Sequence, residues 1–140
     1  MNVGHSTFPL AHLAIAVKEI SSASGVYQAL GFTLAEPEIV AAQHVRAQLA
    51  TKGDLHIELL EPCPAGTGPI AKFIEKRGPG LHHVALRSTD LQADLAALEN
   101  SGIKLLPGFP ADGLGGTRVA FLDPKTTGGA LIELVGAKTR

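Results

Sequence analysis

One structural pattern occurs twice along the chain, and this internal repeat constrains the fold more than any other feature. Each half opens with an apolar strand that carries a histidine, His12 or His83, and closes with an aliphatic strand that carries a glutamate, Glu58 or Glu133. The repeat offset is 71 residues at the histidines (83 − 12) and 75 at the glutamates (133 − 58), a difference that loop insertions explain. Two copies of one module can bring these four side chains to a shared seam, where they would bind a metal ion.

Apolar periodicity and turn residues predict a β-α-β-β-β order in each half. In the first half we expect a helix and four strands, at residues 22–30 and at residues 10–17, 32–34, 43–50 and 55–60. In the second half we expect a helix capped by Asp90 and ended by Gly102, with strands at residues 81–87, 103–106, 117–122 and 130–135. The fold class is therefore α+β, with two tandem modules that form a curled mixed sheet around a metal-binding cavity.

The segment between the halves is rich in proline and glycine and leads into a short helix that begins near Pro69. With 140 residues, the chain is long enough for one domain with a sizeable core. We expect a single domain over residues 8–137, divided into module one at 8–62, a linker helix at 63–79 and module two at 80–137.

Composition and charge exclude several classes of function. The net charge is -1, only 18% of residues are charged and no basic run occurs, so nucleic acids and acidic membrane surfaces are not expected partners. The apolar stretches are too short to span a membrane, and residues 1–11 lack the features of a secretory signal. Cys63 is the single cysteine and cannot form an internal disulfide. We therefore expect a cytoplasmic location.

The two glutamates are the most informative candidates for a site. Glu58 and Glu133 each lie within a run of aliphatic residues, and burying an unpaired carboxylate is costly. Alternation along each strand fits either an outward face or a polar cavity face. One histidine alone would more often be a hydrogen-bonded structural residue, but His12 and His83 occupy equivalent repeat positions. Together the four side chains suit a divalent Co, Ni, Mn, Zn or Fe ion with positions left open.

Several blocks of sequence resemble the vicinal oxygen chelate superfamily and, within it, the methylmalonyl-CoA epimerase family. The blocks lie at residues 12–17, 57–62, 68–78, 80–85, 116–125 and 127–134 and are spread over nearly the whole chain. The helix at 68–78 and the Pro-Lys and Gly-Gly residues of the last two blocks are the most specific to the epimerases. The histidine and glutamate positions are common to the superfamily.

The resemblance implies a set of metal ligands. By position, His12, His83 and Glu133 match the family's ligands, and Glu58 matches a fourth position that is glutamine in some members. The implied cofactor is a divalent metal, with Co(II) the expected ion and Ni, Mn, Zn or Fe as alternatives. A homodimer is also implied.

The implied activity is epimerisation of methylmalonyl-CoA at the α-carbon through a metal-stabilised enolate. Glu133 would then also carry a proton as the catalytic residue. Lys125 and Thr127 lie before the Glu133 strand and would contact the CoA phosphates, by analogy with the family's loop.

The chain departs from the epimerase pattern at one position. Some epimerases carry a second glutamate base after a Gln-Gly-Val turn, and here the corresponding segment is Gln43 to Gln48, with Ala47 at the place of the base. His44, in place of the usual glycine, is a candidate replacement, although an exposed turn histidine is the simpler interpretation. The second acid–base group is therefore open.

Other functions use the same fold and must be weighed. A glyoxalase I-like lactoylglutathione lyase and a ring-cleaving Fe(II) dioxygenase would use a similar set of ligands. A ligand-sequestering module would need no metal, but such proteins usually lack the ligand positions that are filled here. The epimerase-specific blocks favour the epimerase over the other two enzymes.

Overall fold

A computed structural model describes residues 7–138 of the chain, without the side chain of Lys138. These residues form two compact units: a first module of residues 12–82, and a second module of residues 7–11 and 83–138. The predicted α+β fold class is confirmed. The predicted absence of a secretory signal rests partly on residues 1–6, which lie outside the described residues. The single domain predicted over residues 8–137 stays a prediction.

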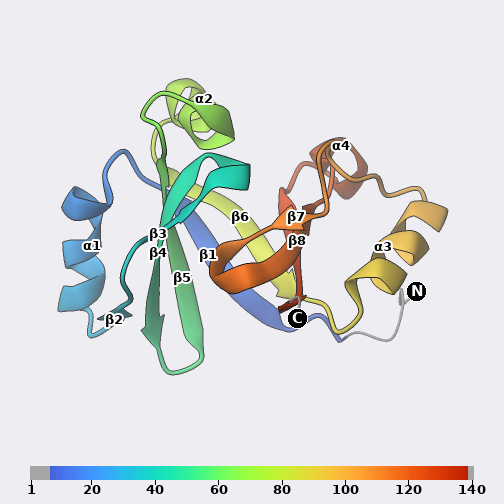
Figure 1. Ribbon diagram of the computed structural model, residues 1–140, viewed down its shortest axis with the longest axis horizontal. Coiled ribbons are helices and arrows are strands. Elements are labelled where there is room, and N and C mark those ends of the chain that lie inside the picture. Colours follow the sequence, from blue (N-terminus) through green and yellow to red (C-terminus); the bar gives the residue numbers. More distant parts are fainter. Residues whose placement is uncertain (1–6, 139–140) are drawn as a thin grey trace. The chain divides into compact units, whose positions relative to one another are not determined.

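The first module is a mixed sheet with helices (Figure 1). Its elements are β1 (Leu10–Ala16), α1 (Ile20–Ala29), β2 (Thr33–Leu34), β3 (Glu38–Val40), β4 (Val45–Lys52), β5 (Leu55–Pro62) and α2 (Gly68–Arg77). The strand order is β2-β4-β5-β1, with β3 also paired to β4. Strand β1 runs parallel to β5, whereas the pairs that involve β4 are antiparallel.

Helix α1 starts two residues earlier than predicted because its first turn is capped from another strand. The backbone N–H of Ile20 donates to the Glu61 carboxylate of β5 at 2.8 Å. A helix N-terminus needs acceptors for its free N–H groups, and a carboxylate there also interacts favourably with the helix dipole. Ile20 then packs with Val17 and Leu59 in the buried core between α1 and the sheet.

The outer edge of the first module is one strand interrupted in the middle. Residues of β2 pair with β4 in one register, and β3 resumes the pairing with a shift of one residue. The Gln48 side chain donates to the Ala35 carbonyl at 3.0 Å within this interruption, and Pro37 has no N–H to continue the ladder. The predicted strand at 43–50 starts only at Val45, because residues 41–43 form a 3-10 turn.

The second module repeats this topology. Its elements are β6 (Gly80–Arg87, continuous with the end of the first module), α3 (Leu91–Asn100), β7 (Ala111–Asp112), β8 (Thr117–Phe121), α4 (Pro124–Thr127) and β9 (Ile132–Lys138). The order β6-β9-β8-β7 matches β1-β5-β4-β2 of the first module, and β6 is parallel to β9 as β1 is to β5. The predicted β-α-β-β-β repeat is thus present in the pairing of the strands.

Helix α3 covers one face of the second sheet. As predicted, Asp90 caps it, accepting a hydrogen bond from the Ala93 N–H at 3.2 Å. Leu95 and Leu98 of this helix are buried against Leu134 of β9. Each helix is therefore anchored by apolar residues that alternate with the polar positions of its sheet.

The predicted strand at residues 103–106 is wrong. Only an isolated bridge between Leu105 and Leu122 forms there, and the edge strand β7 lies further on, at Ala111–Asp112. Pro107 and Pro110 interrupt the segment, and proline cannot donate to a ladder. Helix α4 was not predicted; the Asp123 side chain accepts from the Lys125 N–H at 3.0 Å and begins it. Among residues 7–138, no helix is both long enough and apolar enough to cross a membrane.

Candidate metal centre

The first histidine–glutamate pair lies on neighbouring parallel strands. Ala14 of β1 is in register with Glu58 of β5, so His12, two residues earlier on β1, shares the face of Glu58. The His12 Nε2 atom lies 3.5 Å from the Glu58 Oε2 atom, and both side chains are largely buried. The repeat therefore predicted a real contact between the two polar residues of this module.

The second pair has the same construction in the second module. Ala85 of β6 is in register with Glu133 of β9, which places His83 on the face of Glu133. The His83 Nε2 atom lies 3.3 Å from the Glu133 Oε1 atom, with only 2% and 5% of the two side chains exposed. The ring of Phe121 in β8 packs edge-on against the His83 imidazole at 4.9 Å. This aromatic contact limits the orientations that the imidazole can adopt.

The strand alternation that the sequence left open is resolved in both modules. Ile57 and Leu59 flank Glu58 and pack in the core with α1. Ile132 and Leu134 flank Glu133 and pack in the core with α3. Because neighbouring residues of a strand point to opposite faces, each glutamate lies on the face away from its helix. Both glutamates are nevertheless buried, with 8% of Glu58 and 4% of Glu133 exposed to solvent.

The two nitrogen–oxygen distances fit ligands of a metal better than simple ion pairs. A charge-assisted N–H···O bond is about 2.7–2.9 Å long. Two atoms that each lie about 2.0–2.1 Å from one ion at a tetrahedral angle are about 3.3–3.4 Å apart. The observed 3.3 Å lies within the second range and the observed 3.5 Å lies just above it. Neutral imidazole and carboxylate are also the donors that divalent transition metals accept.

The residues predicted to contact substrate lie in and beside α4. Lys125 is exposed, and the Thr127 hydroxyl donates to the Ala130 carbonyl at 2.5 Å, which holds the turn between α4 and β9. This contact gives Thr127 a structural role that the sequence did not reveal. Contact of Lys125 and Thr127 with substrate stays a prediction.

The position that lacks the expected second base is on β4. Ala47 is fully buried and lies directly opposite Glu38 of β3. Sequence reasoning missed β3 because this strand is only three residues long and follows a proline; the polar–apolar–apolar order of residues 38–40 was too short a signal. His44, the candidate proposed from the sequence, precedes β4 in a left-handed conformation (φ 55°) and is exposed.

His44 is packed against the first residue of α2. A Cβ atom added to Gly68 would lie 2.7 Å from the Cβ atom of His44, and Gly68 also has a positive φ of 90°. Both features require glycine at this position. The His44 carbonyl in addition accepts a hydrogen bond from the Cys63 N–H at 2.9 Å. These contacts give His44 a structural role at the junction of β4 and α2.

This packing predicts a measurable coupling between the two positions. We expect Gly68→Ala to destabilise the protein by about 1–3 kcal/mol, through backbone strain and the clash with His44. In a His44→Gly background the clash disappears and the cost should fall by at least about 0.5 kcal/mol. Urea unfolding of the two single variants and the double variant measures this coupling, and strictly additive free energies would contradict it.

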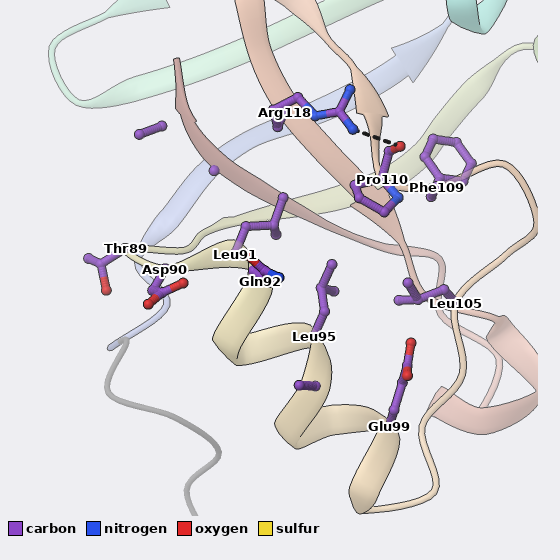
Figure 2. A pocket seen from close by; sticks show the side chains of 13 residues that line it. Thr89, Asp90, Leu91, Gln92, Leu95, Glu99, Leu105, Phe109, Pro110 and Arg118 are labelled. Carbon is purple, nitrogen blue, oxygen red and sulfur yellow. Dashed lines mark hydrogen bonds between the residues drawn. The ribbon is translucent and has the colours of Figure 1, made fainter. Parts of the chain in front are cut away.

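A hollow of about 750 Å³ lies in the second module (Figure 2). Leu91 and Leu95 of α3 line one side, and Phe109, Pro110 and Arg118 line another. The Arg118 guanidinium donates to the Pro110 carbonyl at 3.1 Å, which ties the two walls of that side together. The hollow is lined by none of the predicted metal or substrate residues.

Comparisons with known proteins place the chain in a family. Residues 11–121 match the Glyoxalase/Bleomycin resistance protein/Dioxygenase superfamily. The chain is 37% identical to the uncharacterised protein YqjC of Bacillus subtilis over 92% of each chain. It is 36% identical to the ethylmalonyl-CoA/methylmalonyl-CoA epimerase of Cereibacter sphaeroides, over 89% of this chain and 95% of that protein.

A solved structure extends the likeness to the fold. A variant of Streptomyces coelicolor methylmalonyl-CoA epimerase in complex with 2-nitronate-propionyl-CoA is similar with a TM-score of 0.86 and 30% identity. The match covers 96% of this chain and 100% of that one. By repeat, strand pairing and sequence, the chain belongs to the Glyoxalase/Bleomycin resistance protein/Dioxygenase superfamily, in which its relatives include methylmalonyl-CoA epimerases.

Proposed function

We propose that the protein is a divalent-metal-dependent epimerase of methylmalonyl-CoA. In this proposal His12, His83 and Glu133 hold one ion, and the family resemblance adds Glu58 as the fourth ligand. The observation that carries it is the pair of repeat-related histidine–glutamate contacts, at 3.5 Å and 3.3 Å, each on a buried sheet face. The relatives named as epimerases supply the substrate class, a CoA thioester with an acidic α-hydrogen.

The chain's own groups would carry the proton transfers. A divalent ion, when bound, would polarise the thioester carbonyl and stabilise the negative charge that develops on its oxygen. The Glu133 carboxylate takes the α-proton from one face of the substrate, and a second group returns a proton to the other face. Phe121 holds the His83 ring in place, and burial of the pair keeps water from competing for the carboxylate.

Further parts of the proposal rest on the family resemblance. Lys125 and Thr127 would contact the CoA portion, and Co(II) is the expected ion among Co, Ni, Mn, Zn and Fe. A homodimer and a cytoplasmic location belong to the same proposal. The lactoylglutathione lyase, the Fe(II) dioxygenase and the sequestering module are less well supported, because the named relatives at 30% and 36% identity are epimerases.

The test is α-hydrogen exchange. In heavy water, metal-stripped protein reloaded with Co(II) is expected to wash deuterium into methylmalonyl-CoA and to interconvert its epimers. Stripped protein should be slower by at least about 100-fold, since the ion provides the main charge stabilisation. Failure to exchange with any of the five ions would rule out the epimerase.

A second measurement tests the ligands without relying on activity. His83→Ala should bind less than one tenth of the Co(II) that the wild type binds at equal free ion, as measured by metal analysis after dialysis. His82→Ala is the matched control, because this neighbouring histidine packs against Phe73 of α2 at 4.9 Å. Equal metal content in the His83 variant and the wild type would contradict the proposed site.

A further inference from the structure

The second module contains a row of three rings that leads to the proposed metal ligand His83. The ring of Phe121 packs edge-on against the His83 imidazole, with 4.9 Å between the ring centroids and 87° between the planes. The ring of Phe109 packs in turn against Phe121, at 5.1 Å and 69°. Edge-to-face contacts between rings are directional, so each ring constrains the orientation of the next. All three residues belong to the same compact unit.

Phe121 lies beside the metal-binding pair of this module but beyond the reach of the edge strand. Phe121 of β8 is directly opposite Glu133 of β9, and residues that oppose each other on antiparallel strands share a face. The edge strand β7 is in register with Arg118 and Val119 of β8, so its two residues do not extend as far as Phe121. The loop between α3 and β7 therefore takes the place of an edge strand beside Phe121.

Hydrogen bonds fix this loop on both sides of Phe109. Before Phe109, the Leu106 N–H donates to the Phe121 carbonyl at 2.9 Å. After Phe109, the Pro110 carbonyl accepts from the Arg118 guanidinium at 3.1 Å (Figure 2). The Phe109 ring itself lines the hollow and also packs against the core cluster under α3. The loop thus holds the Phe109 ring at a defined place against β8.

We propose that Phe109 is a positioning residue for the metal site and that, through the Phe121 ring, it fixes the orientation of the His83 imidazole. The inference rests on the proposed metal-dependent function. A metal ligand has to be held within about 0.5 Å of its productive place by the residues packed around it. Rotation of the imidazole would move its Nε2 atom, which lies 3.3 Å from the Glu133 carboxylate. Phe109 acts through Phe121 and not through contact with the ion.

The test is the binding of Co(II) to Phe109→Leu and Phe109→Met, which remove the ring but keep an apolar side chain. Both variants should bind Co(II) about three- to tenfold more weakly than the wild type, a smaller loss than the roughly 10–100-fold typical of residues that hold a ligand directly. At saturating Co(II), the visible absorption bands of the ion should shift, because these bands report the geometry of its ligands. Phe109→Tyr keeps the ring and should match the wild type in both measurements.

Two controls separate positioning from a general loss of stability. Leu91→Ala removes a side chain that lines the same hollow and packs against the same core cluster. It should lower the midpoint of thermal unfolding without changing the Co(II) affinity or the absorption bands. In a Phe121→Leu background the row of rings is already broken, so Phe109→Leu should weaken Co(II) binding by less than about twofold further.

The alternative outcomes are distinguishable. Unchanged Co(II) affinity and absorption bands in the Phe109→Leu and Phe109→Met variants would overturn the inference. Equal changes in Leu91→Ala would also overturn it, and so would the full additional loss in the Phe121→Leu background, since either result shows an effect that does not pass through Phe121. If the wild type itself bound no Co(II), the proposed function would fail, and that result would be seen before any variant is compared.

Discussion

Replacement of Glu133 by glutamine is expected to reduce epimerisation by at least about 100-fold while leaving the protein folded. Glutamine has nearly the same shape as glutamate and can still present an oxygen to His83, whose Nε2 atom lies 3.3 Å from the Glu133 Oε1 atom. An amide cannot accept the α-proton, however, and loss of an acid–base group typically costs about 10²–10⁴-fold in rate. The measurement is the turnover of methylmalonyl-CoA at saturating Co(II), with Co(II) affinity determined in parallel.

The repeat offers a matched control for this prediction. Glu58 has the same strand position, the same kind of histidine contact at 3.5 Å and similar burial. The family resemblance places Glu58 at a position that is glutamine in some members. Glu58→Gln is therefore expected to retain activity within about tenfold of the wild type, which is the smallest loss usually seen when a contact that supports a metal site is altered. Equal losses in the two variants would contradict the assignment of Glu133 as the proton carrier and would indicate that both residues act only as ligands.

The largest effects on stability are expected at the leucines that follow the two glutamates. Leu59 and Leu134 are 0% and 2% exposed and belong to separate core clusters, one under α1 and one under α3. Truncation of a buried leucine to alanine removes its contacts and leaves a cavity, at a cost of about 2–5 kcal/mol. Since a domain is typically stable by only about 5–15 kcal/mol, either variant should have a clearly lower urea midpoint.

Leu81→Ala provides the control for these two substitutions. Leu81 lies in β6 and is 58% exposed, so the same chemical change removes few buried contacts and should cost less than about 0.5 kcal/mol. A Leu59 or Leu134 variant with the midpoint of Leu81→Ala would show that these cores are loosely packed, contrary to their burial.

The repeat and its polar residues were predictable because they depend on local alternation. Glu58 and Glu133 interrupt aliphatic strands, and that interruption remains visible without any knowledge of the partners of each strand. The histidine–glutamate contacts follow from the parallel pairing of the first and last strands of a module, which a duplicated pattern suggests but does not specify. The family resemblance then identified which polar residues to examine.

The remaining features depend on contacts between distant parts of the chain. Helix α1 begins at Ile20 because a carboxylate from β5 caps it, and no residue near Ile20 signals this. The edge strands are interrupted at prolines, so their short pieces lacked the length that alternation needs, and β3 was missed for that reason. The second module shows the same failure, since a strand was expected at residues 103–106 and β7 lies beyond Pro110.

The parallel pairing of β1 with β5 and of β6 with β9 makes the candidate site tolerant of insertions. In sequence, Glu58 lies 46 positions after His12 (58 − 12) and Glu133 lies 50 positions after His83 (133 − 83), yet the two contacts differ by only 0.2 Å (3.5 − 3.3). The strands that carry the ligands bond directly to each other, so the intervening helix, edge strand and hairpin can lengthen outward without moving them. Divergence in loop length between duplicated halves therefore leaves the histidine–glutamate contact of each half intact.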